Sequence, residues 1–360
     1  MERPNAWKKY VDEAEQKKVM DFAEGYRQFI SNCKTERECT AYFIEEAKKV
    51  GFKDLDECIA KGETLSPGDK VYRSNFGKAL AAFVIGEEPL QKGIDILGAH
   101  IDSPRMDLKQ NPLYEDADMV LLDTHYYGGI KKYQWVTLPL ALHGVVVKKD
   151  GTRIAVAIGD KPGDPVFGVS DLLIHLAQTQ MEKKAAKAVE GEQLDVLVGS
   201  IPFIEEGEKE PKKKKELVKK NILRILKETY DIEEEDFLSA EIEVVPAGEA
   251  RDYGFDRSMI MGYGHDDRVC AYPSFWALAD AKPGKKTLAA LLVDKEEIGS
   301  VGATGMQSRF FENTVAELVA MTGDYSELFV RRALANSKAL SSDVSAAFDA
   351  LYADVSDKKN

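Results

Sequence analysis

Short apolar runs bounded by glycine constrain the fold of this chain most strongly. Two of them, AAFVIG (81–86) and DILGAHID (95–102), follow one another, and a third, TLAALLVDKEE (287–297), lies far downstream. Apolar runs of this length are typical of strands rather than of helices. The first sixty residues instead show apolar side chains at helical spacing, such as Tyr26 and Phe29. The two patterns together predict an α/β fold.

The stretch between these strand segments differs in character. In LALHGVVVKKDGTRIAVAIG (140–159), two β-rich runs flank Asp150-Gly151, a dipeptide that favours a hairpin turn. Two α/β segments around such a stretch indicate one catalytic domain interrupted by a second, β-rich domain. The predicted boundaries are 1–108 and 250–360 for the two catalytic segments and 109–249 for the insert.

The charge balance restricts the partners of the chain. It has 49 lysines and arginines against 62 aspartates and glutamates, a net charge of −13 and a pI near 5.1. This balance argues against a protein that mainly coats nucleic acid or an anionic membrane. The lysine run at 212–215 is therefore predicted to be a solvated loop rather than an anion-binding patch. The glycines of IGSVGATG (298–305) lack the lysine with which a phosphate-binding loop reaches its phosphate.

The sequence contains neither an apolar membrane-spanning segment nor an apolar signal segment, and this predicts its localisation. No apolar run in the sequence approaches the roughly 18 to 20 residues that a membrane-spanning helix needs, and the N-terminus is charged where a signal peptide is apolar. We therefore expect a cytoplasmic protein with neither a membrane nor a nucleic acid as partner. The four cysteines form no C-x-x-C pair, which indicates buried or free thiols in a chain of this length.

Three groups of acidic and histidine residues lie where strands are expected to end, which is where open α/β sheets bind ligands. In HID (100–102), the two-residue period of a strand puts the imidazole and the carboxylate on one side. HDDR (265–268) is an acidic turn before a helical run, and DKEE (294–297) follows a strand directly. Taken singly, each also fits a plainer role, namely a hydrogen-bonded core histidine, a helix cap or an exposed acidic loop.

Taken together, the three groups predict a metal site. One imidazole nitrogen with several carboxylate oxygens suits Zn²⁺, Mn²⁺ or Co²⁺ better than Ca²⁺. Two such ions about 3.5–4 Å apart form a co-catalytic pair when a carboxylate bridges them, and Asp266 is the natural bridge. The expected cofactor is therefore two divalent metal ions, with Zn²⁺ favoured and Mn²⁺ or Co²⁺ as alternatives.

Five segments, in order, carry a resemblance to a known family. They are GAHIDSPRMDLKQNPL (98–113), YYGGIKKYQW (126–135), GHDDRVCAYPS (264–274), DKEEIGS (294–300) and SSDVSAA (341–347). The chain resembles the M18 metalloaminopeptidases, which are dinuclear zinc exopeptidases, and is closer to bacterial members than to eukaryotic aspartyl aminopeptidases. The resemblance implies a three-layer α/β catalytic domain of the zinc-exopeptidase type, interrupted by a β-rich dimerisation domain.

The resemblance also implies metal ligands. His100 would bind one ion, and Asp343 would complete the shell of that ion. Asp266 would bridge both ions, and Glu297 would bind the ion opposite His100. No other cofactor is implied.

Two further residues receive implied catalytic roles. Glu296 would act as general base and acid on the attacking water, and Asp102 would orient the imidazole of His100. The implied reaction is hydrolysis of the first peptide bond of a peptide with a free N-terminus. The preferred N-terminal residue is not implied.

One departure from the family pattern concerns the second ion. Family members carry a last histidine ligand near their C-terminus, whereas no histidine follows His265 in this sequence. We therefore expect the second ion to lack one ligand within these residues, and the ending at SDKKN favours a chain that continues. The alternative is a catalytically silent assembly or binding subunit of the same fold, which would not bind two metal equivalents.

The resemblance finally implies self-association. The insert would mediate dimerisation, and the family's tetrahedral dodecamers enclose their active sites. In the family, a histidine of the insert can reach the active site of a neighbouring subunit. His175 is the possible counterpart here, and a plain surface or core histidine is the competing interpretation.

Overall fold

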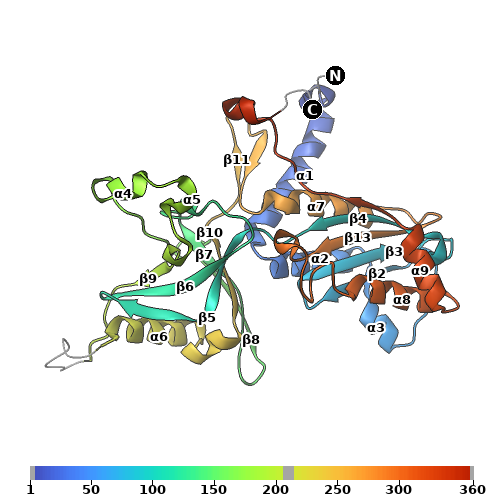
Figure 1. The fold of residues 1–360 in the computed structure, drawn as a ribbon. Helices are drawn as coiled ribbons and strands as arrows, with labels where there is room; N and C mark the ends of the chain where they lie inside the picture. The colour runs from blue at the N-terminus through green and yellow to red at the C-terminus, as the bar shows by residue number, and fades with distance from the viewer. Residues whose placement is uncertain (1–4, 206–214, 357–360) are drawn as a thin grey trace. The chain divides into compact units, whose positions relative to one another are not determined.

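The computed structural model describes residues 5–205 and 215–356, which divide into two compact units (Figure 1). The first, called here the split unit, comprises Met1–Asp102 and Ala250–Asn360, and the second, the insert, comprises Ser103–Glu249. The insert thus begins at Ser103, whereas the sequence analysis placed its start at residue 109. The lysine run at 212–215, apart from Lys215, lies outside the described residues.

The split unit is built on a six-stranded sheet with the order β1-β2-β3-β13-β4-β14. Its strands are β1 (Lys53–Asp54), β2 (Lys70–Asn75), β3 (Ala79–Val84), β4 (Ile94–His100), β13 (Thr287–Val293) and β14 (Lys338–Ser341). β3 is antiparallel to β2 and β13, whereas β13 and β14 both run parallel to β4, one on each side of it. These last three strands therefore end at the same edge of the sheet.

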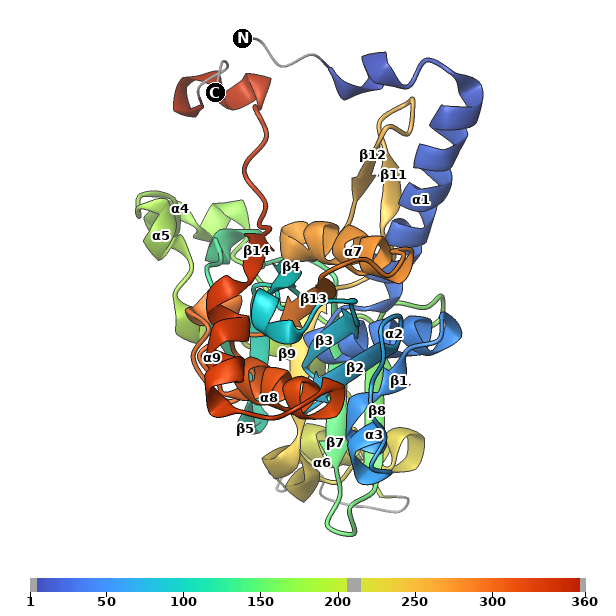
Figure 2. The same ribbon diagram turned by 90° about the vertical axis from the view of Figure 1, so that its right-hand side faces the viewer.

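Helices cover both faces of this sheet (Figures 1 and 2). One core cluster joins the sheet to α1 (Glu13–Asn32), α2 (Glu36–Lys49) and α7 (His265–Ala279). The other joins it to α3 (Leu55–Ala60), α8 (Phe310–Thr322) and α9 (Glu327–Asn336). The predicted three-layer α/β fold is confirmed.

The pattern of β3 explains how one sheet supports two cores. Leu80 and Val84 belong to the first cluster, whereas Ala81 and Phe83 between them belong to the second. Successive side chains of a strand point to opposite faces, so a strand covered on both sides is apolar throughout. This is why the run AAFVIG (81–86) shows no polar alternation.

The N-terminal helices begin and end at recognisable signals. Thr35 caps α2, accepting from the backbone N–H of Glu38, whose side chain in turn accepts from the backbone N–H of Thr35. The helix ends at Lys49, and Gly51 follows with φ +89°. Gly51 suits the end of this helix, because glycine adopts this left-handed conformation without steric cost.

The insert contains a six-stranded antiparallel sheet with the order β8-β7-β10-β5-β6-β9. Its strands are β5 (Arg105–Asp116), β6 (Met119–Tyr127), β7 (Leu140–Val147), β8 (Arg153–Ile158), β9 (Val196–Gly199) and β10 (Glu241–Pro246). Its α-helices in the described residues are α4 (Gln178–Met181), α5 (Ala185–Ala188) and α6 (Leu217–Tyr230). β7 and β8 form the hairpin around Asp150-Gly151, and Gly151 has φ +86°.

A two-stranded hairpin of β11 (Arg251–Tyr253) and β12 (Met259–Met261) leads from the insert into α7. None of the helices in the described ranges combines the length and the apolar character needed to cross a bilayer.

Candidate metal centre

The strand ends of the split unit bring the candidate residues together. β4 and β13 are parallel neighbours, and their register places Val293 beside His100, the last residue of β4. The 3-10 helix η8 (Glu296–Ile298) follows β13, and Asp343 follows β14. Because the carboxyl ends of parallel strands share one edge, side chains that are far apart in the sequence meet there.

Asp102 holds the imidazole of His100. The Nδ1 atom of His100 lies 3.0 Å from the backbone carbonyl oxygen of Asp102 and 3.2 Å from its carboxylate. His100 is only 3% exposed and Asp102 is fully buried, so the contact is shielded from water. When the ring is neutral and carries its proton on Nδ1, it presents the lone pair of Nε2 to the opposite side.

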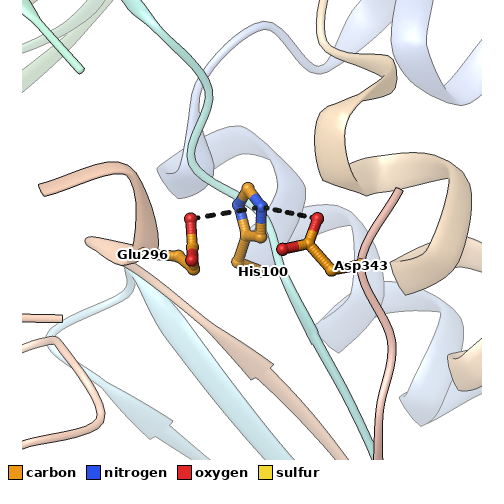
Figure 3. A group of neighbouring side chains, drawn as sticks. All are labelled: His100, Glu296 and Asp343. Carbon is orange, nitrogen blue, oxygen red and sulfur yellow. Dashed lines mark ion pairs between the residues drawn. The ribbon is translucent and has the colours of Figure 1, made fainter. Parts of the chain in front are cut away.

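Three carboxylates face that second nitrogen. The Nε2 atom lies 3.2 Å from Asp266 Oδ1, 3.7 Å from Glu296 Oε2 and 3.9 Å from Asp343 Oδ1. Figure 3 shows Glu296 and Asp343 on either side of the ring, at the end of the strand that carries His100. About half of the side-chain surface of each of these three acids is exposed, so a ligand can reach them from solvent.

Asp102 has a second set of contacts that the sequence analysis did not predict. Its Oδ1 accepts the backbone N–H of Glu296 and its Oδ2 accepts that of Glu297, each at 3.2 Å. One buried carboxylate thus holds both the imidazole and the backbone of the loop that carries the two glutamates.

The two aspartates that begin α7 differ in their surroundings. Asp266 is half exposed beside His100, whereas Asp267 is fully buried. The peptide bond between them is cis, and neither residue has helical dihedral angles.

The electrostatics of the cluster are those of crowded carboxylates. Burial raises the pKa of Glu297 to about 7, and the charge of Asp266 adds to this rise. Burial also raises the pKa of Asp267 to about 6. Burial alone would lower the pKa of His100, but the hydrogen bond and charge of Asp102 outweigh it and raise that pKa to about 9. The protein therefore holds more negative charge here than it neutralises with its own cations.

The donor set fits a divalent metal ion. The following groups each offer ligand atoms within 4.8 Å of one another: His100, Glu296 and Asp343; His100, Asp266 and Glu297; Asp266, Asp267 and Asp343. Within the described residues, no hydrogen bond of good geometry reaches either carboxylate oxygen of the buried Asp267, although the thiol of Cys270, a weak donor, lies beside it. A bound cation would compensate this buried charge, and one imidazole with several carboxylates suits Zn²⁺, Mn²⁺ or Co²⁺.

His265 and Arg268, which flank these aspartates in the sequence, have other partners. His265 Nδ1 lies 2.8 Å from the hydroxyl of Tyr26, and its Nε2 lies 3.1 Å from the carbonyl oxygen of Ile260. Arg268 is fully buried and donates to the backbone carbonyls of Cys33, Lys34 and Ile101. Both side chains therefore support the fold around the centre.

Arg268→Leu should lower the free energy of unfolding by about 3 kcal/mol or more, because three buried carbonyl groups lose their donor and each unsatisfied group costs about 1–3 kcal/mol. Urea-unfolding midpoints of the two proteins measure the effect. Arg331→Leu is the matched control, since Arg331 is exposed and its ion pair with Glu327 is worth at most about 1 kcal/mol. Equal midpoints for the two variants would contradict a supporting role of Arg268.

His175, the candidate from the insert, lies in the 3-10 turn Ile174–Leu176. Its side chain is exposed. Its participation in a site remains a prediction.

Comparisons with known proteins identify the family of this chain. A model of the family described as aminopeptidase I zinc metalloprotease (M18) matches residues 29–360. The probable M18 family aminopeptidase 1 of Clostridium acetobutylicum is 62% identical over 359 residues, which are 100% of this chain and 76% of that relative.

Solved structures show the same fold. The crystal structure of aminopeptidase I from Clostridium acetobutylicum matches with a TM-score of 0.86 and 59% identity, over 97% of this chain and 74% of that chain. The M18 aminopeptidase from Thermotoga maritima matches with a TM-score of 0.89 and 43% identity, over 99% of this chain and 75% of that chain. This chain therefore belongs to the M18 family and is a metal-dependent aminopeptidase.

Proposed function

We propose that this chain uses two divalent cations to remove the N-terminal residue from unblocked peptides. The family description names zinc, which is the favoured metal. The observation that carries the proposal is the arrangement around His100, where Asp102 holds Nδ1 while Asp266, Glu296 and Asp343 face Nε2. This is the arrangement that a metal-binding histidine and its supporting carboxylate adopt.

The proposed ligands divide between the two ions. His100, Asp266 and Asp343 would hold one ion, and Asp266 and Glu297 would hold the other, with Asp266 as the bridge. When bound, the ions would polarise the scissile carbonyl group and lower the pKa of the attacking water. The high pKa of Glu297 in the metal-free protein indicates a carboxylate that gains from a nearby cation.

Glu296 is the proposed general base and acid. A carboxylate oxygen of Glu296 would accept a proton from the attacking water and would then donate it to the amine of the leaving peptide. Its side chain is 46% exposed, so water and substrate have access to it. Its backbone N–H is held by Asp102, which keeps the carboxylate at the edge where the metal ligands converge. Asp102 is therefore a positioning residue.

The proposed assembly follows from the relatives. A solved structure of mApe1 from S. cerevisiae, 21% identical with a TM-score of 0.70, is that of a dodecamer. We propose that this chain also self-associates through its insert, first as a dimer and then as a dodecamer. In such an assembly, His175 would reach the active site of a neighbouring subunit.

The first test is release of free amino acids from a panel of peptides by the protein loaded with Zn²⁺, Mn²⁺ or Co²⁺. We expect cleavage of unblocked peptides and none of their N-acetylated forms, because the site acts on a free N-terminus. EDTA should abolish the activity, and restored metal should recover it.

A parallel titration counts the metal equivalents bound per chain. Two equivalents support the dinuclear enzyme. Fewer than two equivalents, together with no cleavage by any metal form, would favour the silent assembly subunit.

A further inference from the structure

A hydrogen bond at the base of the glutamate loop plays no part in the mechanism above. The loop runs from Asp294, directly after β13, to Thr304, and carries both Glu296 and Glu297. The hydroxyl of Thr304 donates to Asp294 Oδ2 over 2.5 Å. Asp294 is 1% exposed and Thr304 is 8% exposed, so the bond is shielded from water. We call this hydrogen bond the clip.

Hydrogen bonds hold the rest of the loop, and two of them come from Gln307, to the carbonyls of Gly299 and Ser300. Glu296, Ile298 and the stretch 301–303 are exposed, so few apolar contacts fix their positions. The clip closes the loop at its two buried ends. Between them, the backbone turns tightly, with φ +69° at Lys295.

A few further hydrogen bonds hold the interior of the loop. The N–H of Ser300 donates to the carbonyl of Lys295 over 2.6 Å. The side-chain amide of Asn75, at the end of β2, donates to the carbonyl of Ala303 over 2.9 Å. The clip is the one among these bonds that joins two buried side chains with a charged acceptor, and such bonds are about twice as strong as neutral ones.

The clip and Asp102 act on the loop from two sides. Asp102 holds the backbone N–H groups of Glu296 and Glu297, as described above. Without the clip, the loop would keep these two bonds and those from Asn75 and Gln307, but it would lose the bond that joins its two buried ends. We infer that the hydrogen bond between Thr304 and Asp294 is a positioning device that aims Glu296 and Glu297, and this inference rests on the function proposed for those glutamates.

Thr304→Val tests the clip, because valine keeps the shape of threonine and removes the hydroxyl. We expect kcat to fall by about 10- to 100-fold and KM to change by less than about threefold, since a displacement near 1 Å of a catalytic group costs up to about 10²-fold. Thr304→Ser retains the hydroxyl and should keep kcat within about threefold of the unaltered protein. This rescue separates positioning from general loss of packing.

Thr314→Val is the matched control. Thr314 is fully buried and its hydroxyl donates to the carbonyl of Phe310 over 2.7 Å, but it lies within α8, outside the loop. It should leave kcat unchanged. If Thr304→Val and Thr314→Val lowered kcat alike, or if Thr304→Ser failed to restore it, the clip would have no positioning role.

Hydrogen exchange of the metal-free protein gives a second test of the clip, which does not depend on enzymatic activity. Thr304→Val should speed exchange of the amides in residues 295–303 by about tenfold, whereas Thr304→Ser and Thr314→Val should not. Unchanged exchange in this segment would overturn the inference. If the unaltered protein cleaved no peptide at all, the proposed function would fail. The exchange comparison would still show whether the clip holds the loop in position.

Discussion

Glu296→Gln should lower kcat on unblocked peptides by at least about 100-fold, because general acid–base catalysis contributes roughly 10²–10⁴-fold and an amide cannot accept the proton of water. The metal content should stay that of the unaltered protein, since Glu296 is not among the proposed ligands. The loop should also keep its position. The contact of Glu296 with Asp102 uses the backbone N–H, which the substitution leaves in place.

Steady-state kinetics with metal analysis of the same samples check this prediction. Glu327→Gln is the control, since it removes an equal charge from an exposed site on α9. Turnover retained in Glu296→Gln would contradict the role of Glu296 as general base and acid. Loss of metal together with turnover would instead identify Glu296 as a ligand, as its place in a group with His100 and Asp343 allows.

Asp266→Ala is expected to remove both metal binding and activity. Asp266 Oδ1 lies 3.2 Å from His100 Nε2, and Asp266 belongs to two of the three candidate ligand groups. Loss of a residue that only supports a ligand weakens metal affinity by about 10- to 100-fold, and loss of a bridging ligand should cost more. Competition with a chelator of known affinity measures the change.

The metal-free protein should respond little to this substitution. Burial is the main cause of the raised pKa of Asp267 and Glu297, and the charge of Asp266 adds to both, so its removal relieves part of the repulsion but also removes its ion pair with His100. Because these two effects oppose one another, Asp266→Ala without metal should unfold at a temperature close to that of the unaltered protein. With metal present, only the unaltered protein should gain in melting temperature.

Asp324→Ala controls for the loss of a carboxylate elsewhere. Asp324 is exposed in the connection between α8 and α9. It should leave metal affinity and melting temperature unchanged. Unchanged metal affinity in Asp266→Ala as well would contradict the bridging role.

The location of the centre could be predicted because the apolar runs that form β4 and β13 end at polar residues. Each run has the length of a strand, and the polar residues His100 and Asp294 mark its carboxyl end. The alternation of polar and apolar residues does not show at which residue a strand ends and the following loop begins. The sequence analysis placed Asp102 on the strand, whereas β4 ends at His100. The contact between the two side chains does not depend on this difference.

Other features left no signal in the sequence. β14 has only four residues, all of them exposed, so neither length nor burial distinguishes it from a loop. The hold of Asp102 on the loop uses backbone N–H groups, which every residue except proline possesses. The clip joins Asp294 to Thr304 across a turn that begins with a left-handed lysine, and this conformation is rare outside glycine, asparagine and aspartate.

The splitting of one unit by the insert has a consequence for biosynthesis. The ribosome releases β4 first, then all of the insert, and only afterwards β13 and β14, although these strands are direct neighbours of β4. At about 5–20 residues per second, roughly 10–50 s separate the emergence of His100 from that of Asp343. The contiguous insert can fold during this interval, whereas β4 cannot pair with β13 or β14 until those strands have been synthesised. Zinc uptake is therefore expected to be a late event, confined to nascent chains that have passed residue 343.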